Sequence, residues 1–425
     1  MGEDQLSRDL ETALQAIPII DPHSHIDPRR PTARNLDEIL GYHYYTELAH
    51  SAGMDKGPLS PEVAPRERVR AILSYLERID NTVQYSWFLE IARTFLGFQG
   101  DRITAKDCDT LWNAAERVMA QPDWEEQILR RSNLEKIFLT NDFDDPLEGF
   151  DSSRYVPCLR TDDLVFHLDK PEVRHRLAKA TKIEVHDSAS LSAALRKLFE
   201  RFVAGGAKAC AVSLSPYFNP QVVGYGRIEL SLSNLLQGDK AAGTAVNVTH
   251  FVFWSLAELC REFRLPFDLM IGVNRKVYRH GVYQGQDLFD QRTSLFAFAE
   301  LFNAFPEVTF PISVLSSGQN QELVSFSWIF PNVVTSGHWW YSNIPAYIEA
   351  DCRARLQAVP KTKQIGYYSD AYKLEFVLPK YNMYRRILAR ILADDFVRPE
   401  IYTEEQAIQF ARLLLRDNAR RIFGV

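Results

Sequence analysis

Short apolar runs alternate with longer amphipathic stretches along most of the 425-residue chain. Polar or glycine-containing residues follow each apolar run. We expect eight strands, at residues 16–21, 135–140, 154–159, 207–214, 267–273, 308–314, 332–337 and 363–369. Strands that are apolar throughout and alternate with amphipathic helices are typical of a parallel sheet covered by helices.

The amphipathic stretches at 191–204, 250–263 and 291–305 are predicted helices between strands, and two more helices at 382–395 and 404–424 close the chain. Eight strand units favour a closed barrel over an open, doubly wound sheet. No GxGxxG turn follows the first strand, which argues against a dinucleotide-binding fold. The sequence therefore predicts an α/β protein with a (β/α)8, TIM-type barrel.

The spacing of the strands divides the chain into three parts. Residues 1–26 hold the first strand and a preceding helix, and residues 134–425 hold the rest of the barrel with its C-terminal helices. Residues 27–133 read as a mostly helical insertion that caps the barrel mouth. A second long connection, 215–247, is expected to be a polar loop beside the same mouth.

Charge and composition exclude several functions. The chain has 49 basic and 55 acidic residues, a formal charge of −6, and no run of basic residues longer than a short pair. Nucleic-acid-binding proteins usually carry a basic patch, so we expect no such partner. The apolar stretches are too short for a membrane span, and the charged N-terminus is unlike a signal peptide. We expect a cytoplasmic protein, whose five cysteines show no CxxC spacing for zinc or disulfides.

Two histidines one residue apart follow the first strand, in "DPHSHIDP" at 21–28. Positions two apart share a face of a strand, so His23 and His25 are predicted to point to one spot. Two neutral imidazoles aimed at one spot make half of a metal site. The alternative is a surface turn between Pro22 and Pro28.

Asp370 ends the eighth predicted strand. In a closed barrel this strand lies next to the first, so the Asp370 carboxylate can join His23 and His25 as a third ligand. Two histidines and a carboxylate with an open position are typical of a catalytic metal site. The alternative is that Asp370 caps the following helix.

Two arginines also follow apolar strands, where a charge needs a partner. Arg160 can bind a substrate carboxylate with both arms of its guanidinium, or form a salt bridge with Asp162 or Asp163. Arg275 allows the same two interpretations.

Histidine and aromatic side chains complete the set of candidates. Trp339 and Trp340 can form a platform for a sugar or belong to the core, and His338 can be a ligand, a proton carrier or an ordinary buried polar residue. His43 and Tyr44 lie on a predicted helix of the insertion. They suit proton transfer over an active site, or packing on the barrel.

Seven segments of the chain, in order, are similar to those of one family. They are DPHSHIDP, LGYHYYTELAHSAGM, LTNDFDDP, VPCLRTDD, SGHWWYSN, IGYYSDAYKLEFVLPKYNMYRRIL and LLRDNARRIFG. With these segments the chain resembles the uronate isomerases of the amidohydrolase superfamily.

The resemblance implies a (β/α)8 barrel with one divalent metal ion, usually zinc, bound by His23, His25 and Asp370. It implies that Arg160 contacts the carboxylate of a small sugar acid and that His43 and Tyr44 lie near the sugar. The implied reaction interconverts an aldose and a ketose uronate by moving a proton between adjacent carbons through an enediolate. Members of the family often form homo-oligomers.

The chain also departs from the family pattern. Leu214 and Ser215 stand where the family has an Asp-His pair, Met270 stands where it has a histidine, and Tyr372 stands where it has an arginine. Two other functions therefore compete with the isomerase. One is metal-dependent hydrolysis of a lactone, ester or amide, and the other is binding of a sugar acid without catalysis.

Overall fold

The computed structural model describes residues 5–238 and 241–425. Each of the eight predicted positions holds or overlaps a central strand; a short strand also follows β2, and the third position is divided into two short strands. The strands are β1 (Ile19–Asp21), β2 (Leu134–Phe138) with β3 (Asn141–Asp142), β4 (Tyr155–Val156) with β5 (Cys158–Arg160), β6 (Ala209–Leu214), β7 (Phe267–Ile271), β10 (Phe310–Val314), β11 (Val333–Ser336) and β12 (Gln364–Ile365).

The strands pair in parallel and in chain order. One sheet has the order β1-β2-β4, and a second has the order β3-β5-β6-β7-β10-β11-β12. The two sheets are continuous through β4 and β5, which are separated only by Pro157. Proline has no backbone N–H for a strand hydrogen bond, so the strand is interrupted there. This succession is that of a (β/α)8 barrel, as the sequence predicts.

The segments after β1 and β12 meet just beyond the strand ends. The Asp370 N–H donates to the His23 carbonyl at 3.1 Å, and the His25 N–H donates to the Ala371 carbonyl at 2.8 Å. The Asp21 carboxylate adds a bond from the Ser369 N–H at 2.8 Å. The first and last barrel segments are thus joined at the end where the strands carry their C-termini.

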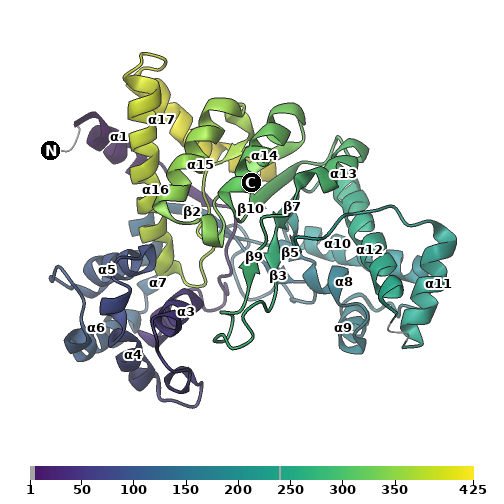
Figure 1. Ribbon diagram of the computed structural model, residues 1–425, viewed down its shortest axis with the longest axis horizontal. Coiled ribbons are helices and arrows are strands. Elements are labelled where there is room, and N and C mark those ends of the chain that lie inside the picture. The colour runs from purple at the N-terminus through teal and green to yellow at the C-terminus, as the bar shows by residue number, and fades with distance from the viewer. Residues whose placement is uncertain (1–4, 239–240) are drawn as a thin grey trace.

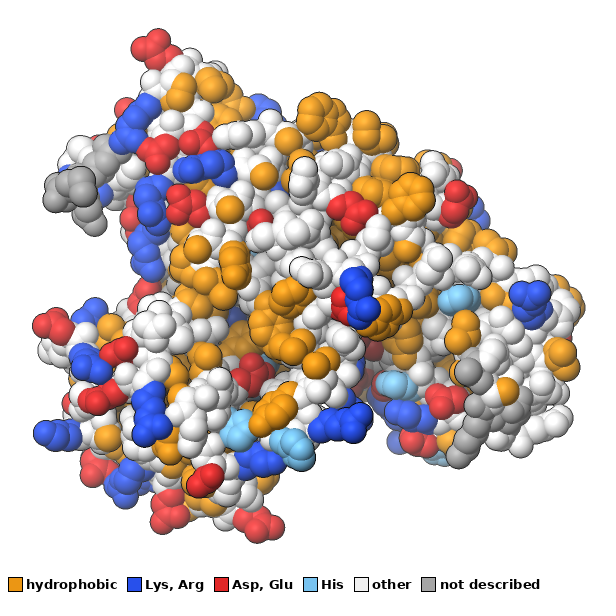
Figure 2. Space-filling model, viewed as in Figure 1, with side chains coloured by type: hydrophobic (Ala, Val, Ile, Leu, Met, Phe, Trp, Pro, Cys, Tyr) orange, Lys and Arg blue, Asp and Glu red, His pale blue; other side chains and the backbone are white. Residues whose placement is uncertain are grey.

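Helices cover the strands and form a separate lobe (Figure 1). Around the barrel they are α1 (Gln5–Gln15), α8 (Asp162–Phe166), α9 (Pro171–Thr181), α10 (Ser188–Ala204), α11 (Tyr225–Leu236), α12 (Ala242–Phe263), α13 (Ala299–Ala304), α14 (Ser317–Ile329), α15 (Pro345–Ala358), α16 (Val377–Leu392), α17 (Glu404–Arg412) and α18 (Asn418–Phe423). Among the described residues, no helix is both long and apolar enough to cross a membrane. Basic and acidic side chains are interspersed over the face seen in Figure 2.

The lobe is built from residues 27–133, in which helices predominate as predicted. They are α2 (Asp37–Leu40), α3 (His43–Ser51), α4 (Pro65–Leu73), α5 (Val83–Leu96), α6 (Cys108–Met119) and α7 (Trp124–Ser132). Both α5 and α7 pack against α16, and Figure 1 shows this lobe at one end of the molecule. We call it the helical cap.

Two local predictions are wrong. Residues 215–247 are not a loop throughout, because α11 and the start of α12 lie within them; residues 239 and 240 fall outside the described part. The helix expected at 291–305 begins later, with a 3-10 turn at Leu295–Phe298, because Ser294 caps that turn by accepting the Phe296 N–H. In the first case an amphipathic helix replaces the predicted loop, and in the second a capped 3-10 turn replaces the start of the predicted helix.

Alternation along the strands separates two apolar layers. Ala209 and Ala211 of β6 face the barrel interior with Phe138, whereas Cys210 and Val212 pack into the layer between strands and helices. Successive side chains of a strand point to opposite faces, and both faces are covered here. The interior layer fills the lower barrel and leaves the C-terminal ends of the strands for polar side chains.

A buried glutamate joins the cap to the barrel. Glu375 lies in the 3-10 turn Leu374–Phe376 that follows β12, and its Oε1 accepts the Trp124 indole N–H and the Ala33 N–H, both at 2.9 Å. Burial raises the pKa of Glu375 from 4.5 to about 7, although both hydrogen bonds favour the charged form. Trp124 and Ala33 come from opposite ends of the cap, so one carboxyl group holds both.

The raised pKa of Glu375 predicts a pH-dependent stability. The folded protein retains a proton that the unfolded chain releases near pH 4.5, so this contribution to stability falls as the pH rises from about 4.5 through 7. Glu375→Gln keeps the acceptor oxygen but cannot ionise. Between pH 5 and pH 8, urea unfolding is expected to show a loss in free energy that is about 2 to 3 kcal/mol larger for the wild type than for the variant. Equal losses would contradict the role of this carboxyl group.

Candidate metal centre

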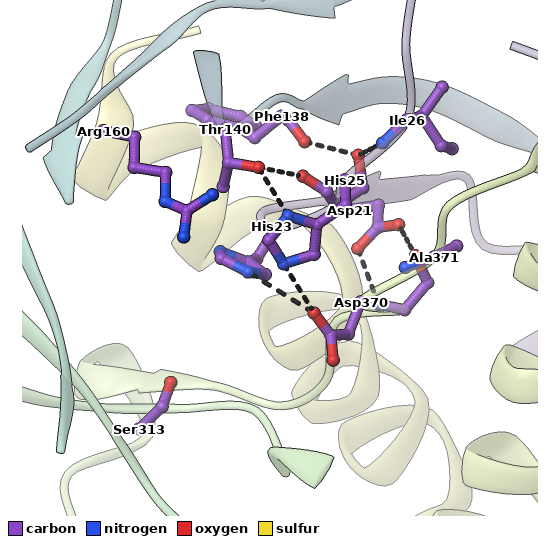
Figure 3. Close-up of polar contacts among 12 residues, drawn as sticks. Asp21, His23, His25, Ile26, Phe138, Thr140, Arg160, Ser313, Asp370 and Ala371 are labelled. Atoms are coloured by element: carbon purple, nitrogen blue, oxygen red, sulfur yellow. Dashed lines mark hydrogen bonds and ion pairs between the residues drawn. The ribbon is translucent and has the colours of Figure 1, made fainter. Parts of the chain in front are cut away.

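His23 and His25 lie in the segment that follows β1, with Ser24 between them. The Ser24 hydroxyl donates to the Phe138 carbonyl at 2.7 Å, which ties this segment to β2. Alternation then turns both imidazoles to the opposite side, towards Asp370 (Figure 3). The two histidines point to one spot, as the sequence predicts.

Asp370 completes a group of three ligand atoms. His23 Nε2 lies 3.5 Å and His25 Nε2 3.3 Å from Asp370 Oδ1, and one donor atom from each residue falls within 4.8 Å of the others. The Asp370 and His23 side chains are buried, and that of His25 is 24% exposed. These residues come from the segments that follow β1 and β12.

The donor set fits a divalent cation. His23 Nε2 and Asp370 Oδ1 are buried and have no hydrogen-bond partner, and such atoms cost free energy unless something satisfies them. Burial disfavours the charged form of Asp370, but the two imidazoles outweigh it and hold the pKa of Asp370 well below its usual range. Burial also lowers the pKa of His25, whereas the interactions with Asp370 outweigh burial and raise the pKa of His23. A divalent ion would bind the carboxylate and both imidazoles in their deprotonated form.

Thr140 fixes the tautomer of His25. Its hydroxyl donates to the Ser24 carbonyl at 3.0 Å and lies 2.8 Å from His25 Nδ1. Because the hydroxyl hydrogen is used on Ser24, Nδ1 carries the ring hydrogen and donates it to Thr140. The lone pair of His25 is then on Nε2, which faces Asp370.

Asp370 is held in an unusual backbone conformation. Its φ is +51°, in the left-handed region that favours glycine. The Tyr42 hydroxyl donates to the Asp370 carbonyl at 3.1 Å, and the Tyr44 hydroxyl donates to Oδ2 at 3.3 Å. The cap therefore reaches the proposed ligand directly. The predicted alternative, a helix cap at Asp370, does not occur, since the next turn begins at Leu374.

The three residues lie in a cavity of about 210 Å³ between the barrel and the cap. Nine predicted site residues line it: His23, His25, His43, Tyr44, Arg160, Arg275, Trp339, Trp340 and Asp370. His43 and Tyr44 come from the first turn of α3. Burial lowers the pKa of His43 to about 3, so its imidazole is neutral at physiological pH.

Each cavity arginine is paired with an aspartate. Arg160 Nε lies 3.2 Å from Asp162 Oδ2, and the Arg275 guanidinium lies 2.7 Å from Asp287 Oδ2. Arg160 stands on the far side of the imidazoles from Asp370 in Figure 3, and its Nε contact leaves the terminal nitrogens for another anion. Both predicted alternatives, a salt bridge and a place beside the substrate, are compatible with this geometry.

His338 lies apart from the other candidates. It is 1% exposed, its ring packs near Tyr367 and Tyr384, and burial lowers its pKa well below the usual value. It is absent from the residues that line the cavity. In the segment after β11, the His338 side chain is buried away from the cavity, while Trp339, the next residue, lines it.

Of the positions that depart from the family pattern, Met270 and Tyr372 line the cavity. Tyr372 stacks on His25 with ring centroids 4.8 Å apart. Leu214 packs instead into the layer between strands and helices. Sequence reasoning missed Ser213, Gln284 and Asp287, which also line the cavity.

Gln284 and Asp287 are supplied by a hairpin. They lie between β8 (Val273–Asn274) and β9 (Leu288–Phe289), which pair in antiparallel fashion after β7. A signal in the sequence was the long polar interval after the fifth strand, but it does not say which residues turn inwards.

Comparisons with known proteins agree with this architecture. A model of the glucuronate isomerase family matches residues 3–423. The chain belongs to the glucuronate isomerase family. A uronate isomerase from Thermotoga petrophila is 22% identical over 460 residues, which span 100% of this chain and 99% of the relative.

Solved structures of this family share the fold. A uronate isomerase from Thermotoga maritima superposes with a TM-score of 0.89 at 19% identity, over 100% of this chain and 99% of the other. A glucuronate isomerase from Caulobacter crescentus gives a TM-score of 0.89 at 17% identity, over 100% and 97%. At such identities the structural likeness establishes the fold, and the family model establishes membership.

The bond between Thr140 and His25 predicts the effect of removing one hydroxyl. Thr140→Val keeps the shape of the side chain but leaves His25 Nδ1 without its partner. We expect Zn²⁺ affinity to fall roughly tenfold, as for other groups that orient a ligand, when it is measured by competition with a chelating dye. Thr140→Ser retains the hydroxyl and should bind Zn²⁺ as the wild type does. Loss of affinity in both variants, or in neither, would show that the hydroxyl does not set the tautomer.

Proposed function

We propose that this protein is a metal-dependent isomerase that interconverts the aldose and ketose forms of a uronate. The supporting observation is the convergence of His23, His25 and Asp370 ligand atoms within 4.8 Å inside a cavity, in a chain of this family. These residues would bind one divalent ion, with zinc as the first choice for two imidazoles and a carboxylate. When bound, the ion would act as a Lewis acid towards substrate oxygens.

Arg160 is proposed to bind the substrate carboxylate. Its Nε is engaged by Asp162, so the planar terminal nitrogens are oriented and free to form a bidentate pair. Arg275, oriented in the same way by Asp287, offers a second positive charge at the cavity wall. With these two groups the cavity favours an acidic sugar over a neutral one.

His43 and Tyr44 are proposed to handle protons. Isomerisation removes a proton from the carbon beside a carbonyl group and returns one to the neighbouring carbon. Burial keeps the imidazole of His43 neutral, so one of its ring nitrogens has a lone pair for a proton, and burial raises the pKa of Tyr44 and keeps its phenol protonated. Tyr44 donates a hydrogen bond to Asp370 Oδ2 and so orients that carboxylate.

The two tryptophans are proposed to form the apolar wall of the substrate site. Trp339 is buried, and Trp340 lies beside His43 with ring centroids 6.0 Å apart. Such rings exclude water and strengthen the polar interactions around the substrate. We assign no contact with substrate to His338, because it lies outside the cavity lining.

The first test is metal content together with isomerase activity. We expect the wild type to hold about one equivalent of divalent metal by elemental analysis and to convert glucuronate or galacturonate to the ketose, followed by NMR. Asp370→Asn should lose at least tenfold in metal affinity and in turnover. Asp144→Asn is a matched control, because that carboxylate pairs with Arg176 outside the cavity.

Several results would overturn the proposed function. Metal-free wild type that stays metal-free after reconstitution would remove the metal site. Bound metal with hydrolysis of lactones and no conversion of uronates would replace the isomerase with a hydrolase.

A second test concerns the substrate carboxylate. Arg160→Ala should raise the KM for uronates by roughly 10- to 100-fold, the value of a charged hydrogen-bonded pair, with a smaller effect on kcat. Steady-state kinetics on a uronate and on the neutral aldose of the same stereochemistry separate the two interpretations of Arg160. If activity on both sugars falls equally, Arg160 serves to brace Asp162 and does not read the carboxylate.

A further inference from the structure

Lys380, on α16, is a fully buried lysine beside the segment that carries Asp370. Its Nζ donates to the Ser369 carbonyl at 2.7 Å. Within the described ranges 5–238 and 241–425, no carboxylate forms a salt bridge with it. Lysine is almost never buried in this way without a partner, so the surroundings of this ammonium group need an explanation.

Aromatic rings surround the Lys380 ammonium group. Nζ lies 4.7 Å from the ring centre of Trp87, 5.4 Å from Tyr42, 5.5 Å from Tyr44 and 6.0 Å from Phe376. The faces of aromatic rings attract cations, most strongly where the pair is shielded from water. The rings take the place of a carboxylate partner.

The same rings bind the proposed metal ligand. Tyr42 donates to the Asp370 carbonyl, and Tyr44 donates to its Oδ2. Lys380 is therefore linked to Asp370 only through other residues. One link is the Ser369 carbonyl, and the other is the pair of tyrosines. Trp87, from α5, extends this arrangement into the cap.

The backbone at Asp370 needs such support. A left-handed φ is unfavourable for a non-glycine residue and persists only where the surroundings enforce it. The backbone N–H of Asp370 is bound by the His23 carbonyl and its carbonyl by Tyr42. The carbonyl of the preceding residue, Ser369, is bound by Lys380.

We propose that Lys380 is a positioning residue of the metal centre, whose ammonium group fixes the Ser369 carbonyl and the Tyr42–Tyr44 pair so that the Asp370 carboxylate stays in place for the cation. This inference rests on the metal site of the proposed function. The proposal predicts the sign of the change in metal affinity when Lys380 is replaced by a neutral residue. If Lys380 acted only by charge repulsion, its neutral variants would bind the cation more tightly. If it positions Asp370, they bind the cation more weakly.

The test uses two neutral variants of Lys380 and one matched control. Lys380→Gln keeps a donor near Ser369 but removes the charge, and Lys380→Met removes both. Lys363→Met is the control, because Lys363 also binds two carbonyls, those of Ser327 and Phe330, but lies at the start of β12, outside the cavity lining. Each purified full-length protein is titrated with Zn²⁺ in competition with a chelating dye, after circular dichroism has confirmed folding.

We expect Zn²⁺ affinity to fall roughly tenfold or more in both Lys380 variants and to be unchanged in Lys363→Met. The visible absorption of the Co²⁺-loaded proteins should also change in the Lys380 variants, since these bands report ligand geometry.

Three results would overturn the role of Lys380. They are equal or tighter Zn²⁺ binding by Lys380→Gln, equal weakening in Lys363→Met, and failure of Lys380→Gln to fold, which would make the lysine part of the core. In the first two cases a wild type that binds Zn²⁺ leaves the proposed function intact. A wild type that binds no Zn²⁺ overturns both proposals at once.

Discussion

The site depends on the contact between the two ends of the barrel, where the segment after β1 meets the segment after β12. Asp370 is at its centre: its N–H is bound by His23, its carbonyl by Tyr42, and its side chain faces two imidazoles. Asp21, two residues before His23, binds the N–H of Ser369. The same hydrogen bonds that join the barrel ends therefore set the ligand distances, so the site cannot form unless the barrel is complete. The left-handed backbone at Asp370 is the strained conformation that these bonds enforce.

The helical cap completes the site from above. It supplies His43 and Tyr44 to the cavity and, through Tyr42 and Trp87, part of the aromatic surroundings of Lys380. Aromatic rings keep water away, and in their low-dielectric surroundings each polar contact is stronger and each unpaired group more costly. That explains both the depressed pKa of His43 and the raised pKa of Tyr44. The long insertion is thus part of the cavity wall, and Glu375 joins Ala33 and Trp124, which lie near its two ends.

Two residues that line the cavity depart from the family pattern. Met270 and Tyr372 line it where the pattern has a histidine and an arginine, whereas His23, His25, Asp370 and Arg160 retain the expected types. Tyr372 replaces a flexible charge with a ring stacked on His25. The two arginines of the cavity, Arg160 and Arg275, are each paired with an aspartate, which orients their N–H donors.

The sequence by itself determined the strand positions, the helical nature of the cap and most of the cavity residues. Side chains alternate between the two faces of a strand, and residues just after parallel strands gather at one edge of the sheet, so both can be read from local sequence. It also placed His23, His25 and Asp370 together, since barrel closure brings the first and last strands side by side. Tertiary structure alone decided which neighbours of those residues face inwards: His338 turns into the core and Trp339 into the cavity, and the hairpin after β7 brings Asp287 to Arg275. It also decided the tautomer of His25 through Thr140 and the aromatic partners of Lys380. Those contacts join residues far apart in the chain, and no local pattern encodes a distance between them.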